Sequence, residues 1–258
     1  MTPRRPSPAN TMIVLLLLGL SCASARNGTP GAPPSPQSFA PVVDAPDRSA
    51  DDKKSDGHRK PAELLAFIGV RSGFHIADLG AGEGYSTELL VRAVGPQGEV
   101  FAQNSPFMLK KFMDGKWPER YAKPIMSKVV QVNREFDDPL PAEAKALDAV
   151  VLALFYHDTV WLEADRNKMN RAVFQALRPG GVYVVIDHSA KDGAGVSQAS
   201  QLHRIEEKVV RSEVEAAGFK LIEESSFLRN PGDKRDFNVI DDDRVGQSDR
   251  FSLKFVRP

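Results

Sequence analysis

The sequence has a single cysteine and no excess of charge of either sign. Cys22 is the only thiol among 258 residues, so no disulfide can form within the chain. Lysine plus arginine and aspartate plus glutamate each total 34, which gives a formal net charge of zero. A balanced chain has no field of one sign that would draw it to nucleic acid or to an acidic membrane. We therefore expect no nucleic-acid partner.

Long apolar runs are also scarce, and the most prominent one lies near the N-terminus. Residues 12–20 are apolar, two arginines precede them at residues 4–5, and residues 23–25 form the A-x-A pattern Ala-Ser-Ala. The run is too short to span a membrane. Its three-part setting is typical of an export signal, which we expect over residues 1–25. The protein would then reside in the periplasm or cell envelope.

The position of Cys22 inside this signal leaves a second processing route open. Residues 19–22, Gly-Leu-Ser-Cys, resemble a bacterial lipobox, in which the cysteine is lipidated and becomes the mature N-terminus. Gly19 and Leu20 replace the usual leucine and small residue. Cleavage after Ala25 is slightly preferred, and a membrane tether through lipidated Cys22 is the alternative.

The composition changes twice along the rest of the chain. Residues 26–58 are rich in Pro, Ser, Ala, Gly and Asp and offer little apolar surface. Such a segment cannot offset its ordering entropy, and we expect a disordered linker. Residues 59–258 suit one globular domain, since 41% of the whole chain is hydrophobic and 26% is charged.

From residue 59 onward, apolar runs of strand length alternate with segments of helical period. This pattern predicts an α/β fold with a mostly parallel sheet. The expected strands are residues 74–79, 99–103, 128–132, 147–154, 182–187, 219–227 and 250–256, and the main expected helices are residues 61–70, 85–94, 165–177 and 205–217. The run 147–154 is apolar almost throughout, as in a central strand buried on both faces.

The segment 76–85 reads Ile-Ala-Asp-Leu-Gly-Ala-Gly-Glu-Gly-Tyr and joins the first strand to a helix. Glycines at such a turn let a ligand approach the backbone, and the helix N-terminus supplies free N–H donors. Tyr85 occupies the position of the third glycine of a dinucleotide fingerprint, which disfavours a nucleotide-dependent oxidoreductase. Asp78 precedes the first glycine by two residues. A carboxylate there suits a cofactor with a cationic amino-acid end.

Together with the strand 147–154 and the Arg-Pro-Gly-Gly turn at 178–181, this loop resembles the class I S-adenosylmethionine-dependent methyltransferases. Residues 59–65, 186–189 and 213–219 are similar to a group of exported bacterial predicted methyltransferases. The resemblance implies a Rossmann-like class I methyltransferase fold, with a seven-stranded, mostly parallel sheet whose last strand is antiparallel. It also implies S-adenosylmethionine as the cofactor.

The resemblance further assigns roles within the cofactor site. Asn104 stands where these folds carry an acid that bonds both ribose hydroxyls, and an amide lacks the charge-assisted pairing of a carboxylate. Residues near Asn133 and Phe136 are expected close to the adenine. The residues expected to bind the cofactor are Asp78, Gly80, Ala81, Gly82, Gly84 and Asn104.

Candidate catalytic residues follow two of the expected strands. Tyr156 and His157 come directly after the strand 147–154, and His188 closes the next strand, at the edge where ligands gather in open α/β sheets. Histidine exchanges protons near neutral pH, and a base is needed only if the methyl acceptor is protonated. We expect these three side chains to surround a small-molecule acceptor. Alternatively, His157 packs against the next helix and Asp158 caps that helix.

Two further expectations concern the remaining polar segments. His203, Arg204 and the loop 229–236 form either a lid or a solvated charged loop. The five histidines are not spaced like metal ligands and no thiol cluster exists, so no metal is expected. Export to a compartment poor in S-adenosylmethionine, together with Asn104, favours a rival function: a non-catalytic binding protein that keeps the fold.

Overall fold

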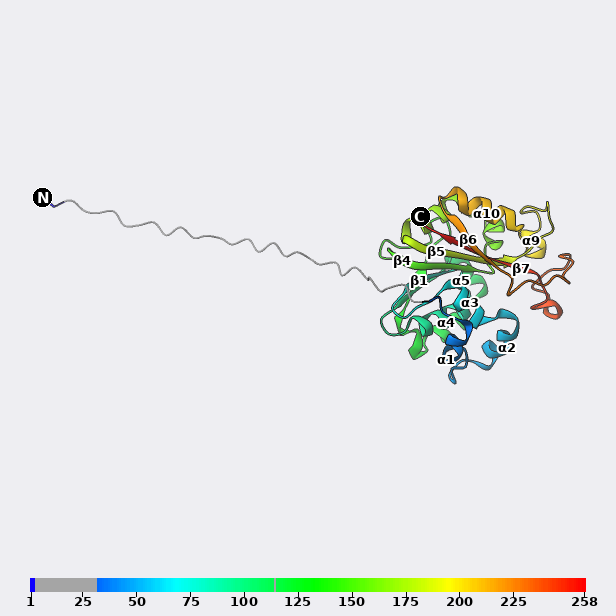
Figure 1. Cartoon of the computed structure of the whole chain (residues 1–258), viewed down its shortest axis with the longest axis horizontal. Coiled ribbons are helices and arrows are strands. Elements are labelled where there is room, and N and C mark those ends of the chain that lie inside the picture. Colours follow the sequence, from blue (N-terminus) through cyan, green and yellow to red (C-terminus); the bar gives the residue numbers. More distant parts are fainter. Residues whose placement is uncertain (3–31, 114) are drawn as a thin grey trace. The chain divides into compact units, whose positions relative to one another are not determined.

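The computed structural model describes residues 1–2, 32–113 and 115–258 (Figure 1). Almost all of the expected export signal, with Cys22, therefore lies outside the described residues. The chain divides into two units, residues 1–32 and 33–258, and every helix and strand described below belongs to the second. In the described ranges, no helix has both the length and the apolar character needed to cross a bilayer.

A seven-stranded sheet forms the centre of the domain, and each expected strand is present. The strands are β1 His75–Leu79, β2 Glu99–Asn104, β3 Val129–Asn133, β4 Leu147–Ala153, β5 Leu177–His188, β6 Lys220–Ser225 and β7 Arg250–Val256. Their order in the sheet is β3-β2-β1-β4-β5-β7-β6. Strand β7 runs antiparallel to both of its neighbours, and all other pairs are parallel. The predicted fold is confirmed.

Helices cover both faces of this sheet (Figure 1). The α-helices are α1 Ala40–Val43, α2 Ala50–Arg59, α3 Pro61–Ile68, α4 Tyr85–Val94, α5 Pro106–Phe112, α6 Lys116–Tyr121, α7 Asp158–Trp161, α8 Arg166–Ala176, α9 Ala199–Leu202 and α10 Glu207–Ala216. Short 3-10 turns occupy Pro36–Phe39, Pro124–Lys128 and Asp242–Arg244. Helices α1, α3 and α4 pack together on one face, and α8 packs against α10 on the other. The central strands are buried between these two layers, as the apolar run of β4 predicts.

The predicted linker 26–58 is folded in the part that the structure describes, so its assignment as disordered is wrong there. Its charged side chains pair with residues far along the chain. Asp52 forms a two-point ion pair with Arg120, at 2.7 and 2.8 Å, and Asp56 accepts a hydrogen bond from the Tyr85 hydroxyl at 2.6 Å. A segment rich in Asp looks solvated from its composition alone. Composition cannot reveal that these carboxylates have partners elsewhere in the chain.

The Arg-Pro-Gly-Gly segment at 178–181 also differs from expectation, because it belongs to the start of β5 rather than to a separate turn. The register between β4 and β5 shifts here, between Leu147 and Ala149. A Cβ on Gly181 would lie 2.9 Å from the Leu147 carbonyl oxygen, closer than real side chains come. The glycine lets β5 approach β4 at the irregularity.

Candidate cofactor and acceptor site

The loop between β1 and α4 turns at three glycines. Gly80, Gly82 and Gly84 have φ of 60°, 60° and 84°, a region that side chains disfavour. A Cβ on Gly80 would lie 2.6 Å from the ring of Phe155, and one on Gly84 would lie 2.7 Å from Arg120. By contrast, a Cβ on Gly82 would meet only a backbone oxygen, at 3.9 Å. The open side of Gly82 is therefore where a ligand can approach the loop backbone.

Two amide side chains at the end of β2 hold this loop. The backbone N–H of Gly80 donates to Gln103 Oε1 at 3.0 Å. Asn104 bonds Gly82 in both directions: its Oδ1 accepts from the Gly82 N–H at 2.9 Å, and its Nδ2 donates to the Gly82 carbonyl at 3.1 Å. Asn104, expected at the ribose hydroxyls, thus uses its amide to shape the glycine loop.

Asp78 lies beneath the loop and is buried. Its carboxylate accepts a hydrogen bond from the Thr87 hydroxyl, at 2.6 Å. Burial raises the pKa of Asp78 to about 7, against the opposing effect of that hydrogen bond. The carboxylate is directed at α4, so Asp78 ties the first strand to the helix that follows the loop.

Arg120, on α6, gives the loop a further support that the sequence did not indicate. Its Nε donates to the carbonyl of Glu83, and its guanidinium pairs with Asp52 and with Glu88 Oε2, the latter at 2.6 Å. Glu88 and Asp52 are almost fully buried. Arg120 therefore links Asp52, in the N-terminal segment, to the glycine loop at Glu83.

A pocket of about 440 Å³ borders the strand ends beside this loop. Phe136 lines it and stacks on Phe155, with ring centroids 5.0 Å apart and planes at 21°. Phe155 is the ring that faces Gly80. The lining residues are Phe107, Glu135, Phe136, Asp137, Trp161, Leu162, Glu163 and Ala164. Phe136, expected near the adenine, thus lies between the glycine loop and a cavity of ligand size.

His157 is buried in the turn between β4 and α7 and is bonded on both sides of its ring. Its Nδ1 lies 2.7 Å from Asp187 Oδ1, and its backbone N–H donates to Asp187 Oδ2 at 2.7 Å. On the other side, its Nε2 lies 3.2 Å from His203 Nδ1 and 3.1 Å from Asp158 Oδ1. His203 Nδ1 is also 3.1 Å from Asp158 Oδ1. No local sequence pattern joins these four residues, which the fold brings together from three segments.

The carboxylates set the charge of this cluster. Burial alone would lower the pKa of His157, but Asp187 and Asp158 outweigh it and raise that pKa to about 10. An imidazole that keeps its proton at neutral pH cannot accept one from a methyl acceptor. In this protonated state His157 holds positive charge at the site and is not a general base.

Tyr156 does not join the cluster, so the expectation that it faces the acceptor is wrong. The side chain is completely buried. Its hydroxyl donates to Glu213 Oε2 on α10 at 2.8 Å and accepts from Asn170 Nδ2 on α8 at 2.9 Å. Residues 156–157 form the turn that leads into α7, and in this turn the Tyr156 side chain enters the core while that of His157 faces Asp187.

His188 does lie beside His157, as the sequence predicts from the two neighbouring strand ends. The ring centroids are 5.8 Å apart, with the planes at 66°. Its Nδ1 is 2.7 Å from the Ser248 hydroxyl. Burial, reinforced by the nearby positive charges of His157 and Arg250, holds the pKa of His188 well below its usual value. A neutral imidazole therefore stands next to a charged one.

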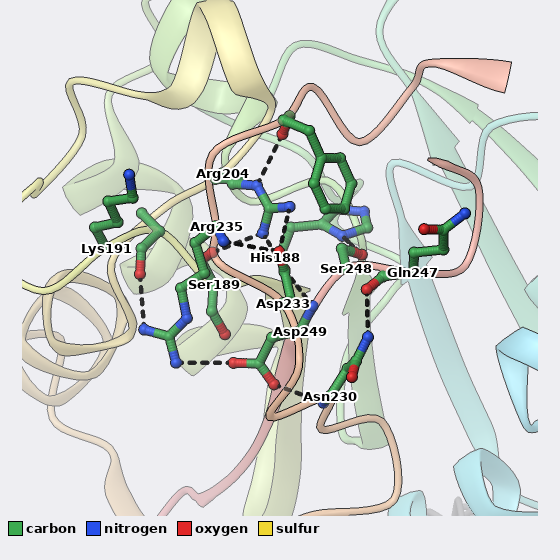
Figure 2. Close-up of polar contacts among 12 residues, drawn as sticks. His188, Ser189, Lys191, Arg204, Asn230, Asp233, Arg235, Gln247, Ser248 and Asp249 are labelled. Carbon is green, nitrogen blue, oxygen red and sulfur yellow. Dashed lines mark hydrogen bonds and ion pairs between the residues drawn. The ribbon is translucent and has the colours of Figure 1, made fainter. Parts of the chain in front are cut away.

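The loop between β6 and β7 is fastened by ion pairs (Figure 2). Arg204 and Asp233 are paired at 2.8 Å with both side chains fully buried. Asp249 pairs with Arg235 at 2.9 Å and with Arg229 at 3.3 Å. Ion pairs thus hold the segment 229–236 to the domain, while Pro231, Gly232, Lys234 and Asp236 stay exposed to solvent. A cavity of about 660 Å³ beside it is lined by Ser189, Ala190, Asp192, Glu206, Glu207, Lys208, Arg211, Arg229, Pro231, Arg235 and Asp249.

The sheet order, the glycine loop and the single antiparallel strand define the class: the chain has the fold of the class I S-adenosylmethionine-dependent methyltransferases. An S-adenosylmethionine-dependent methyltransferase from Aquifex aeolicus matches it with a TM-score of 0.57 at 17% identity, over 87% of this chain and 99% of that one. Geranyl diphosphate C-methyltransferase from Streptomyces coelicolor matches with a TM-score of 0.57 at 16% identity, over 84% and 89%.

Curated relatives point the same way at the level of sequence. The ubiquinone/menaquinone biosynthesis C-methyltransferase UbiE of Pasteurella multocida is 32% identical over 123 residues, 47% of this chain and 42% of that protein. The protein of the same name from Idiomarina loihiensis is 29% identical over 131 residues, 50% and 49%. The match spans about half the length of these relatives. No protein-family model matches the chain.

Proposed function

We propose that this protein is an S-adenosylmethionine-dependent methyltransferase acting on a small-molecule acceptor. The observation that carries the proposal is the open side of Gly82, in a loop otherwise closed by Phe155 and Arg120. The residues present fit the cofactor. Glycine at position 82 leaves open the space that the methionine part of the cofactor needs, and any larger side chain there would fill it. Gly80, Ala81 and Gly82 would hold that part of the cofactor.

The bound cofactor supplies an electrophilic methyl group on a sulfonium. The residues of the chain then have to align the acceptor and exclude water. The pocket beside Phe136 and Trp161 is the place for that acceptor, because it adjoins the ring that packs on the glycine loop. His157 and His188 stand at the neighbouring strand ends, with their ring centroids 5.8 Å apart. They would orient polar groups of the acceptor.

The cofactor loop is tested by Gly82→Val, with Gly193→Val as the matched control. Both glycines have positive φ, 60° and 80°, and neither is crowded, so both variants carry similar backbone strain. Only Gly82→Val places a branched side chain in the proposed cofactor space. We expect at least about a tenfold loss of S-adenosylhomocysteine affinity in calorimetry for Gly82→Val alone, from a clash worth 1.4 kcal/mol or more.

The two variants also show what would contradict the proposal. Equal affinity of folded Gly82→Val and wild type would remove the cofactor from the loop. Equal losses in both variants would assign the effect to backbone strain.

A non-catalytic binding protein is the second candidate, and one observation favours it. Asn104 stands where the resemblance implies an acid, and its amide bonds Gly82 in both directions, so the C-terminal end of β2 offers the ribose no carboxylate. Such a protein would bind S-adenosylhomocysteine weakly or bind another ligand in the pocket. Mass spectrometry of small molecules that copurify with the protein, followed by a methyl-transfer assay on them, separates the two candidates.

A further inference from the structure

Three atoms able to bind a metal meet in the His157 cluster. His157 Nε2, His203 Nδ1 and Asp158 Oδ1 form a triangle with sides of 3.2, 3.1 and 3.1 Å. Ligands about 2.1 Å from one metal ion lie about 3.0 Å apart in cis octahedral geometry and about 3.4 Å apart in tetrahedral geometry. The observed separations fall between these values. One ion can therefore contact all three atoms at ordinary bond lengths.

Asp187 fixes which ring nitrogen of His157 faces the triangle. The buried Asp187 carboxylate lies 2.7 Å from His157 Nδ1 and accepts the backbone N–H groups of His157 and His188, both at 2.7 Å. Its partner Nδ1 must therefore carry a proton, which leaves Nε2 as the side with a lone pair. Metal-bound histidines in proteins almost always donate their other ring N–H to such a carboxylate.

The three atoms of the triangle need added positive charge, from a second proton on His157 or from a bound cation. With His157 neutral, Nε2 and Asp158 Oδ1 are both acceptors 3.1 Å apart. The only hydrogen that can then point into this triangle is the one on His203 Nδ1, and it has to serve all three sides. Either a second proton on His157 or one bound metal ion relieves the repulsion. A bound ion would contact all three atoms at once.

The backbone and the surroundings support a ligand site. His203 has φ 52° and ψ 50°, a left-handed conformation that is uncommon outside glycine and that gathers at ligand-binding positions. Its side chain is 19% exposed and that of Asp158 is 13% exposed, so an ion can reach the triangle from solvent. The Trp161 indole donates to Asp158 Oδ1 at 2.6 Å and also lines the 440 Å³ pocket.

We infer that His157, Asp158 and His203 bind one divalent transition-metal ion, with Asp187 orienting His157. Two imidazoles and a carboxylate suit ions such as Zn²⁺ or Fe²⁺, whereas Mg²⁺ and Ca²⁺ favour oxygen ligands. Three protein ligands leave coordination positions free for water or another small ligand. The inference holds whether or not the protein transfers methyl groups.

The test uses the full chain after its metals are removed with a chelator. Zn²⁺ is titrated by calorimetry and Co²⁺ by visible absorption near neutral pH. We expect one ion per chain, with Co²⁺ d–d bands. His203→Ala and Asp158→Asn, checked for folding by circular dichroism, should each weaken binding at least about tenfold, and Asp187→Asn about 10- to 100-fold. His58→Ala, a histidine outside the cluster, should bind as wild type does.

Two results would overturn the site. Failure of the wild-type chain to bind either ion would mean that the cluster is held by a protonated His157. Binding by folded His203→Ala and Asp158→Asn with wild-type affinity would place the ion elsewhere. Neither result depends on S-adenosylhomocysteine, so loss of the metal site and loss of the proposed methyltransferase function are measured separately.

Discussion

Asp78 is an acid that the fold keeps buried, and its carboxylate accepts a hydrogen bond from the Thr87 hydroxyl. Its pKa is about 7 in the folded chain, against an ordinary value of 3.8. Between these values the folded state binds a proton that the unfolded chain has lost. The contribution of Asp78 to stability is therefore present below about pH 4 and disappears as the pH rises to about 7.

Asp78→Asn removes this titration while keeping an oxygen for Thr87. We expect the variant to gain about 3 kcal/mol in unfolding free energy relative to wild type between pH 5 and pH 8, since each of the two pH units below the pKa of Asp78 corresponds to about 1.4 kcal/mol. Urea unfolding of both chains at the two pH values measures the gain. Parallel pH profiles would show that Asp78 is already ionised at pH 5 in the native state.

Asn104 offers a second test at the residue scale. An aspartate there would keep the bond from the Gly82 N–H but would set a carboxylate oxygen against the Gly82 carbonyl, where the amide now donates at 3.1 Å. We expect Asn104→Asp to lose about 1–3 kcal/mol of stability in urea unfolding, as for a buried polar group left without its partner. S-adenosylhomocysteine affinity should not rise.

The neighbouring strand provides the control for this change. Asn133 lies opposite Asn104 in the β2–β3 register and is exposed. Asn133→Asp adds the same charge at the same edge of the sheet without touching the glycine loop, and its stability should stay within about 0.5 kcal/mol of wild type. Tighter binding by Asn104→Asp would mean that this side chain turns to the ribose in the complex.

Much of the site follows from local sequence, and the part that does not comes from pairing over long distances. The spacing of Gly80, Gly82 and Gly84 predicts a backbone turn, because the positive φ that each glycine adopts is a local property of the chain. The strand ends also predict that His157 and His188 are neighbours. His203 lies 46 residues from His157, and the position reached by its loop depends on the packing of the whole domain.

At the scale of elements, one of the ion pairs that hold the loop between β6 and β7 is fully buried. Arg204 and Asp233 are both inaccessible to solvent, and removing one partner of such a pair leaves the other charge uncompensated. We expect Arg204→Ala to cost about 3–5 kcal/mol of unfolding free energy, measured in urea. The exposed pair Arg134–Asp138 is the control, where Arg134→Ala should cost less than about 1 kcal/mol. Equal small costs would mean that water enters the buried pair.

The helices show which elements the sequence pattern predicts and which it misses. Helix α4 begins and ends where the sequence predicts, at Tyr85–Val94, because a glycine turn bounds it on each side. Helix α2, Ala50–Arg59, was missed because it has almost no apolar residues. Its stability comes from ion pairs such as Asp52–Arg120, whose partner is 68 residues away. Periodicity detects apolar faces and not distant charge pairs.

At the scale of the whole molecule, the N-terminal segment raises the question of processing. We propose that residues 1–25 direct export and are removed, so that the mature chain begins at Arg26 in the periplasm. The observation is the sequence of two arginines, an apolar run and Ala23-Ser24-Ala25. Intact-mass measurement and N-terminal sequencing of protein from the cell envelope of a bacterial host should give Arg26. A lipidated Cys22 would establish the alternative route and a membrane tether.

Either cut lies before residue 33, where the folded unit begins, and so leaves its ion pairs intact. A chain that begins at Pro33 should therefore unfold at the same temperature as the mature protein. A chain that begins at Lys60 lacks both Asp52 and Asp56, which leaves the largely buried Arg120 and the Tyr85 hydroxyl without these partners. Its melting temperature should fall by several degrees, since a loss of about 1 kcal/mol lowers it by about 2–4 °C in a domain of this size. Recovery of the unprocessed chain, starting at Met1, from the cytoplasm would contradict export and leave these stability differences unaffected.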